Sequence, residues 1–279
     1  LQLHKTPIRR WKNLQTWMLT IPRRSETEVA TWMWLSWNPV KVERICTKKL
    51  LNYIFETTDT KHYIVGIEKG KGGLEHFQIR CQNSDPQFFE HVKEWIPEAH
   101  IEKAESDSFE YERKEGRFWT SEDSTDIRKV RFGQLTNAQQ GIVDALQTQN
   151  DRQVDVWYDP KGNHGKTWLT LHLWEIGKAL VVPRASTTPE KMSAFICSSY
   201  KGEEYVIIDI PRSRPIDAAL YESIEEIKDG LVFDQRYSGK AKNIRGVKVC
   251  IFTNKMLDTK KLSHDRWRLH GIHEDGTLS

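Results

Sequence analysis

The segment that most restricts the fold of this chain is DPKGNHGKTW, at residues 159–168. It follows a short apolar run at 154–158 and precedes a predicted helix at 166–176. A strand, a glycine-containing loop and a helix in this order form a phosphate-binding loop, because the loop amides and the positive end of the helix dipole attract an anion. The segment therefore predicts an α/β domain that binds a nucleotide.

The phosphate loop supplies residues for ATP and its Mg²⁺. Its glycines let backbone amides approach the phosphates, Lys166 is expected to reach the β- and γ-phosphates, and Thr167 to hold Mg²⁺. The first glycine of the usual G-x-x-x-x-G-K-T pattern falls at Pro160, so this loop is one residue longer, and a chance turn is the alternative interpretation. The predicted ATP-binding residues of the loop are Gly162, Asn163, His164, Gly165, Lys166 and Thr167.

Strands alternate with helices through the rest of this half, which implies a parallel sheet. Strands are expected at 154–158, 179–183, 205–210 and 247–253, and helices at 166–176, 190–200 and 216–228. Asp209 ends the YVIID strand and is expected to bind the nucleotide's Mg²⁺, whereas Asn254 ends the VCIFTN strand and is expected to orient the attacking water. Ile210 rather than a second acid follows Asp209, so the catalytic base is unassigned.

The first half of the chain has a different pattern. Strands are predicted at 16–21, 63–68 and 75–81, the last two forming a hairpin around the KGKGG turn, and helices at 26–36, 86–95 and 106–115, with 41–57 mixed. Residues from about 120 to 132 are polar without periodicity and are assigned to a linker. Thr136 then caps a helix that runs to 148, with Gln139 in capping-box spacing.

Polar residues on the hairpin could hold a metal ion. Period-two alternation in 75–81 places the apolar side chains on one face and His76 and Gln78 on the other. Glu68 ends the partner strand and could lie opposite them. A carboxylate, an imidazole and an amide oxygen make an open site for Mg²⁺ or Mn²⁺, and a solvated sheet face is the alternative.

A tyrosine and a lysine follow at helical spacing. Tyr111 and Lys114 are three residues apart, which would place them on one face of a helix. A phenol is a poor nucleophile at its ordinary pKa, but a metal ion that polarises a phosphodiester offsets this, and Lys114 could neutralise the phosphate. A pair of surface residues on a helix is the alternative interpretation.

Composition excludes several classes of protein. The net charge is only +3, so global charge is weak evidence for nucleic-acid binding and local clusters must support it. No apolar run approaches the roughly 18–20 residues of a membrane span, and no membrane partner is expected. The four cysteines are far apart and form no CxxC pair, which argues against a zinc site and a disulfide framework.

The order of these motifs resembles the replication-associated (Rep) proteins of CRESS single-stranded DNA viruses over nearly the whole chain. WMLTIP at 17–22, EHFQI at 75–79 and YERKEG at 111–116 look like their three nuclease motifs, the second being a variant of the HUH signature. The phosphate loop, VIIDIPR, a basic segment and FTN look like a superfamily 3 helicase. The longer loop and the DIPR ending look most like smacovirus, nanovirus and alphasatellite proteins, with smacoviruses favoured.

The resemblance implies an α+β ferredoxin-like HUH nuclease domain at 1–120, a linker with an oligomerisation helix at 121–150, and an α/β P-loop (AAA+/superfamily 3) ATPase at 151–279. Tyr111 would nick a stem-loop origin in single-stranded viral DNA, leaving a 5′-phosphotyrosyl link and a free 3′-OH for the host DNA polymerase, and would later rejoin the ends. Glu68, His76 and Gln78 would be the metal ligands. The compartment would be the nucleus of a eukaryotic host, or otherwise the cytoplasm.

The same resemblance implies that the motor works as a homo-hexameric ring. Arg266, or in second place Arg268, would reach the ATP of a neighbouring subunit, and the helix at 136–148 would form a collar between subunits. A basic segment at 236–246 would face the DNA channel through Lys240, Lys242 and Arg245. The alternatives are a plasmid or integrated-element rolling-circle initiator, and a nucleic-acid-binding P-loop ATPase that does not nick.

Overall fold

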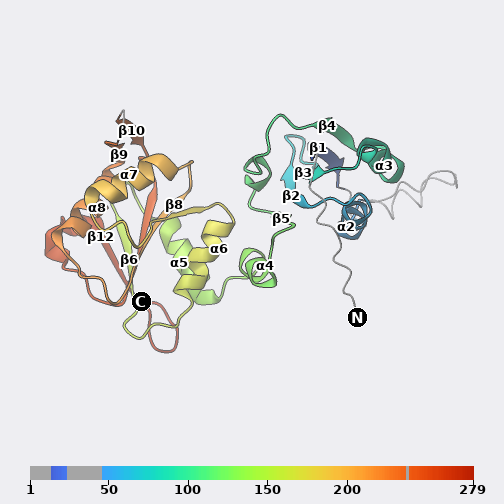
Figure 1. The fold of residues 1–279 in the computed structure, drawn as a ribbon. Helices are drawn as coiled ribbons and strands as arrows, with labels where there is room; N and C mark the ends of the chain where they lie inside the picture. Colours follow the sequence, from blue (N-terminus) through green and yellow to red (C-terminus); the bar gives the residue numbers. More distant parts are fainter. Residues whose placement is uncertain (1–13, 24–45, 237–238) are drawn as a thin grey trace, which may run out of the picture. The chain divides into compact units, whose positions relative to one another are not determined.

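The computed structural model describes residues 14–23, 46–236 and 239–279. The helix predicted at 26–36 lies outside these residues. The chain divides into two compact units, residues 1–125 and 126–279, and each is described by itself (Figure 1). None of the helices in the described ranges has the length and apolar character needed to cross a membrane.

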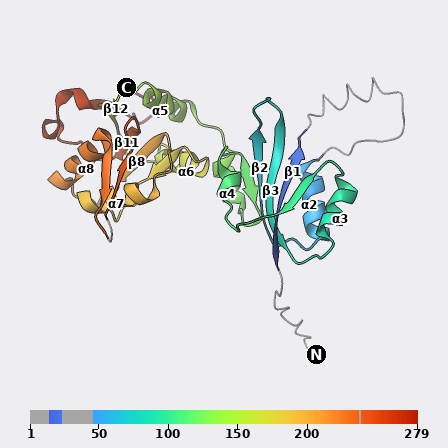
Figure 2. The ribbon, with the colours of Figure 1, turned by 90° about the horizontal axis from the view of Figure 1, so that it is seen from above.

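The first unit is built on a five-stranded antiparallel sheet with the order β4-β1-β3-β2-β5. Figure 2 shows β1, β2 and β3 of this sheet side by side. Two helices and the side chains of one sheet face form its core. In β3 the predicted alternation is confirmed, because Phe77, Ile79 and Cys81 are buried in this core. The elements are β1 (Gln15–Pro22), α2 (Lys48–Thr57), β2 (His62–Lys69), β3 (Glu75–Asn83), α3 (Phe88–Trp95), β4 (His100–Lys103) and β5 (Phe118–Thr120).

The prediction of a helix at 106–115 is wrong. Only one turn of 3₁₀ helix forms there, η1 (Tyr111–Arg113). The preceding serines explain the difference, because the hydroxyl of Ser106 accepts from the amide of Ser108 and the hydroxyl of Ser108 accepts from the amide of Glu110. Such local bonds compete with helix formation.

The second unit contains a five-stranded sheet in which every pairing is parallel, with the order β12-β6-β11-β8-β7. The parallel sheet and its alternation with helices confirm the α/β pattern that the sequence predicted. Its elements are α4 (Thr125–Arg131), α5 (Asn137–Gln147), β6 (Val154–Tyr158), α6 (Lys166–Glu175), β7 (Ala179–Val181), α7 (Pro189–Ser199), β8 (Tyr205–Ile210), α8 (Ala218–Asp229), β11 (Lys248–Thr253) and β12 (Trp267–Gly271).

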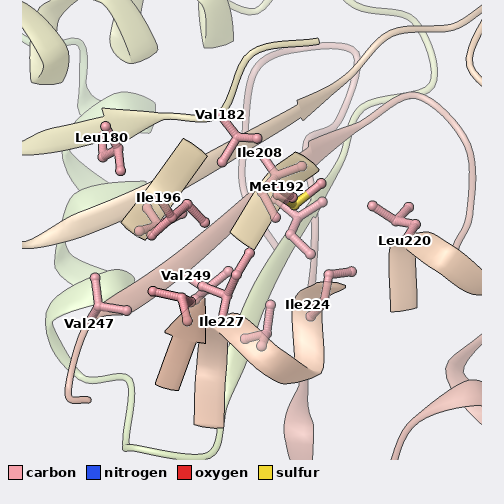
Figure 3. Close-up of a cluster of buried hydrophobic side chains, with 14 of the residues drawn as sticks. Leu180, Val182, Met192, Ile196, Ile208, Leu220, Ile224, Ile227, Val247 and Val249 are labelled. Atoms are coloured by element: carbon pink, nitrogen blue, oxygen red, sulfur yellow. The ribbon is translucent and has the colours of Figure 1, made fainter. Parts of the chain in front are cut away.

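Helices pack on both faces of this sheet. Alternate residues of β8 and β11, among them Ile208 and Val249, face α7 and α8, and Figure 3 shows Met192, Ile196 and Ile224 of those helices packed against them. The other residues of these strands face α5 and α6 in a second cluster. Burial on both faces explains why the strands read as continuous apolar runs.

Helix α5 has the predicted capping box, in which the side chains and backbone amides of Thr136 and Gln139 bond reciprocally. Its apolar side is buried in its own unit, since Ile142, Val143 and Leu146 pack with residues of β6, α6 and β11. These three side chains are therefore unavailable to another copy, and a collar formed by this helix between subunits stays a prediction.

The basic segment near 236–246 includes one strand of a small antiparallel hairpin. Strand β9 (Leu231–Asp234) pairs with β10 (Lys240–Asn243) as a two-stranded sheet. Two single 3₁₀ turns, η2 (Thr259–Lys261) and η3 (His264–Arg266), lead into β12. No strand was predicted at β9, β10 or β12, and the last two are largely polar and carry no continuous apolar run.

Candidate functional sites

The metal ligands predicted on the hairpin share the sheet face that points away from the helices. In the pairing of β2 with β3, Glu68 lies opposite His76, and Gly66 lies opposite Gln78. Nε2 of His76 is 3.5 Å from Oε2 of Glu68. Thr20 of the adjacent strand β1 donates to Oε1 of Gln78 at 2.8 Å, which fixes the amide oxygen in place. The three side chains therefore lie side by side.

Glu68 provides the observation that suits a cation. Its side chain is only 5% exposed, and its Oε1 atom is buried without a hydrogen-bond partner among the described residues. A buried carboxylate oxygen without a partner is costly unless an ion satisfies it. The described residues contain no cluster of three His, Cys, Asp or Glu side chains, so the set relies on an amide oxygen as its third member. Carboxylate, imidazole and amide fit Mg²⁺ or Mn²⁺.

The turn that carries Tyr111 is packed directly on this sheet face. A Cβ at Gly66 would lie 2.4 Å from the carbonyl oxygen of Glu112, so only glycine lets η1 approach β2 this closely. Arg80 of β3 pairs with the fully buried carboxylate of Glu112, with 3.0 Å between Nε and Oε1. Arg80 also donates to the carbonyl of Ser106. These contacts set the position of Tyr111, and no sequence motif predicts them.

Lys114 connects the tyrosine to the predicted metal ligands. Its Nζ is 2.8 Å from Oε2 of Glu68 and 3.8 Å from the centre of the Tyr111 ring. Burial would lower the pKa of Lys114, but its contacts with Glu68 and Tyr111 outweigh burial and raise the pKa above its ordinary value. The ammonium therefore stays charged beside Tyr111, which is 52% exposed and accessible to a large substrate.

The phosphate loop has the backbone that its glycines predict. Gly162 and Gly165 have φ values of 81° and 78°, and Asn163 between them has a φ of 68°. Gly165 is the N-cap of α6, so Lys166 and Thr167 open that helix. Left-handed conformations of this kind turn successive amides toward one side, which suits an anion.

Asp159 is a residue of the phosphate loop that was not predicted to belong to the site. Its carboxylate is fully buried and accepts from the amide of Gly162 at 2.7 Å. It also lies 3.0 Å from Nδ1 of His164 and forms an ion pair with Lys166. Burial would raise the pKa of Asp159, but these bonds, that of Lys166 foremost, hold it below its ordinary value. Its place between β6 and the loop was the available signal.

Asp209 and Asn254 approach the loop from neighbouring strands. Strand β11 lies between β6 and β8, so the carboxyl ends of all three meet at the loop. The Asn254 amide donates to the backbone carbonyl of Asp159. Asp209 pairs with Arg184 at 2.5 Å. Ligands bind at this end of open parallel sheets, so the arrangement suits a nucleotide.

Arg266 and Arg268 lie elsewhere. The Arg266 side chain is 7% exposed and pairs with Asp229 at 2.8 Å. Arg268 lies beside Asp155, near the amino end of β6 and thus opposite the phosphate loop. A role for Arg266 in a neighbouring subunit stays a prediction, and it would require the buried arginine to leave its ion pair with Asp229.

The residues predicted to bind DNA have mixed surroundings. Lys240 is exposed, Lys242 donates to the carbonyl of Tyr200 at 2.8 Å, and Arg245 pairs with Asp151 at 3.3 Å. A hollow of about 680 Å³ beside β10 is lined by Lys240 and Lys242. The hairpin thus presents cations beside a hollow, and its role in DNA binding stays a prediction.

Comparison with curated proteins gives similarity to viral master replication proteins. That of Banana bunchy top virus is 32% identical over 115 residues, which are 41% of this chain and 38% of the relative. That of Faba bean necrotic yellows virus is 31% identical over 127 residues, or 45% of this chain and 42% of the relative. The matched part spans about two fifths of the length of these relatives. No family model matches the chain. The predicted resemblance to nanovirus-type replication proteins is confirmed.

Proposed function

We propose that the chain is a rolling-circle replication initiator in which the first unit is a ferredoxin-like HUH nuclease and the second a superfamily 3 ATPase motor. The observation that carries the proposal is the line of contacts from Tyr111 through Lys114 to Glu68, beside His76 and Gln78. The β-α-β-β-α-β order of the first unit and the similarity to master replication proteins support it.

The substrate is the single-stranded origin DNA of a stem-loop. The phenolic oxygen of Tyr111 attacks the phosphorus of one phosphodiester, the bond from phosphorus to the 3′ oxygen breaks, and a 5′-phosphotyrosyl link and a 3′-OH result. Attack by a 3′-OH on this link releases the tyrosine and rejoins DNA. A bound Mg²⁺ or Mn²⁺ would polarise the phosphodiester. Glu68, His76 and Gln78 would hold it, while Lys114 orients Tyr111 and offsets phosphate charge.

The second unit would convert ATP hydrolysis into unwinding. Lys166 would bind the phosphates, and Thr167 and Asp209 would hold the Mg²⁺. Asn254 would orient the attacking water. Exposed Lys240, with Lys242 and Arg245, would contact the unwound strand, and assembly into a hexamer would surround it. The free 3′-OH would be extended by the host DNA polymerase, in the nucleus if the host is eukaryotic.

An adduct assay tests the nuclease. The full chain is incubated with Mn²⁺ and a labelled single-stranded origin oligonucleotide, and covalent complexes are counted on a denaturing gel. We expect an adduct with the wild type and none with Tyr111→Phe, which should still bind the oligonucleotide because the ring is retained. A fully active Phe variant would remove Tyr111 from the mechanism. DNA binding without any wild-type adduct would favour a P-loop ATPase that does not nick.

A further inference from the structure

One arginine at the phosphate loop has no acidic partner among the residues that the structure describes. Arg212 follows Asp209 by three residues, in the loop that leaves the carboxyl end of β8. Its Nη2 atom donates to the carbonyl of Pro160 at 3.2 Å and to that of Lys161. Among residues 14–23, 46–236 and 239–279, no carboxylate forms an ion pair with Arg212. Carbonyls are neutral acceptors, so the positive charge remains uncompensated.

The guanidinium lies at the bend of the loop. A Cβ at Gly162 would come 2.8 Å from Nη2 of Arg212 and 3.7 Å from the amide nitrogen of Asn254. Two side chains from neighbouring strands therefore converge on the glycine that turns the loop. A guanidinium presents paired donors that match phosphate oxygens, and such charge-assisted bonds are stronger than those to carbonyls.

Three other cations at this end of the sheet are paired with carboxylates. Lys166 pairs with Asp159, Arg184 pairs with Asp209, and Lys161 pairs with Glu274 at 2.6 Å. The arginine expected to act on ATP, Arg266, is buried in an ion pair of its own. Arg212 is thus better placed than Arg266 to meet an incoming phosphate.

We propose that Arg212 binds the terminal phosphate of ATP held by its own chain and stabilises the charge of the transferring phosphoryl group. The inference rests on the proposed ATPase function. In hydrolysis a water oxygen bonds to the γ-phosphorus, the bond from that phosphorus to the bridging oxygen breaks, its electron pair leaves with ADP, and the water releases a proton. Arg212 exchanges no proton in this step. When ATP binds, Arg212 exchanges its hydrogen bonds to the two loop carbonyls for bonds to phosphate oxygens. Because only ATP carries the terminal phosphate, Arg212 distinguishes ATP from ADP.

The test compares Arg212→Gln with the wild-type full chain. Dissociation constants for ADP and for the non-hydrolysable analogue AMP-PNP are measured by competition with a fluorescent nucleotide, and ATP turnover is measured separately. We expect AMP-PNP affinity to fall roughly tenfold with ADP affinity unchanged, and kcat to fall about 10³-fold, the lower range for arginines of this kind. Arg152→Gln is the control and should match the wild type. It removes an exposed arginine that pairs with Asp265 and precedes β6, at the end of that strand away from the phosphate loop.

Three results would overturn the inference. Equal losses of ADP and AMP-PNP affinity would show that Arg212 only holds the loop carbonyls. Unchanged binding and turnover would remove it from the site. Recovery of turnover on adding Lys166→Ala protein, which retains Arg212, would show that the arginine acts on the nucleotide of another chain. A wild-type protein that binds no nucleotide would instead overturn the proposed ATPase, and this inference with it.

Discussion

The two candidate sites differ in how their charges are compensated. On the sheet of the first unit, Lys114 bonds to one oxygen of Glu68 and leaves the other oxygen buried without a partner among the described residues. At the phosphate loop, Asp159 is fully occupied by Lys166, His164 and the amide of Gly162. A cation can therefore join the first site without displacing a contact, whereas phosphates must displace a carboxylate from Lys166 in the second. The site on the first unit can therefore accept its ligand with its contacts intact, whereas the ion pair between Lys166 and Asp159 must break before phosphates bind at the loop.

The largest expected effect separates the two sites. Lys166→Ala should reduce ATP hydrolysis by about 10³-fold, because the transferring phosphate loses its principal cation. Nicking should continue at the wild-type rate, since tyrosine attack needs no nucleotide. Both activities are measured on the same preparation, with circular dichroism to establish that it is folded. Loss of both activities in a folded protein would show that the sites do not work independently.

The second prediction concerns the packing of the tyrosine turn. Gly66→Ala places a methyl group against the carbonyl of Glu112 and should shift Tyr111 by up to about 1 Å. Misplacement on this scale costs up to about 10²-fold in rate. Gly72→Ala is the matched control, because a Cβ there meets nothing within 4 Å. Equal nicking by the two variants would show that the contact with β2 does not position Tyr111.

The third prediction tests the metal ligands. His76→Ala should reduce nicking about 10- to 100-fold at limiting Mn²⁺ and recover in part when Mn²⁺ is raised, since ligand loss weakens metal binding. His62→Ala serves as the control, because this histidine begins β2, at the other end of the strand from Glu68, is half exposed and pairs with Glu122. Wild-type cleavage that persists in EDTA would contradict a metal site.

The smallest expected effect sharpens the contrast at the phosphate loop. Asp159→Asn removes the negative charge that competes with phosphate for Lys166, so affinity for ATP should rise by roughly three- to tenfold, or about 1 kcal/mol. Equilibrium binding of a fluorescent nucleotide measures the change. A weaker affinity would mean that Asp159 mainly supports the loop through Gly162 and His164.

The central strands β6, β8 and β11 of the second unit could be predicted closely because they are buried on both faces. Strand β8 at Tyr205–Ile210 coincides with the prediction, since a continuous apolar run leaves little choice of boundary. The prediction of a helix at 106–115 was wrong because the hydroxyls of Ser106 and Ser108 accept hydrogen bonds from backbone amides two residues further on. Hydrophobic periodicity does not reveal such bonds. Strand β10 is KAKN, and its pairing depends on β9 rather than on its own composition.

The candidate sites divide in the same way. Period-two alternation was sufficient to place His76 and Gln78 on one face. The Arg80–Glu112 pair and the contact of Arg212 with the loop join segments far apart in the chain, so spacing within a motif could not predict them. Local patterns thus predict the candidate site residues, whereas tertiary contacts determine how those residues are held.

The most direct test of the account locates the DNA on the protein. The full chain is reacted with Mn²⁺ and a stem-loop oligonucleotide from the DNA that encodes it, then digested with nuclease and trypsin for mass spectrometry. Trypsin should release residues 104–113, AESDSFEYER, whose single tyrosine is Tyr111. We expect a nucleotide linked through its 5′-phosphate to this tyrosine. A nucleotide on any other residue would contradict it, as would a wild-type protein that cleaves the DNA without a covalent link.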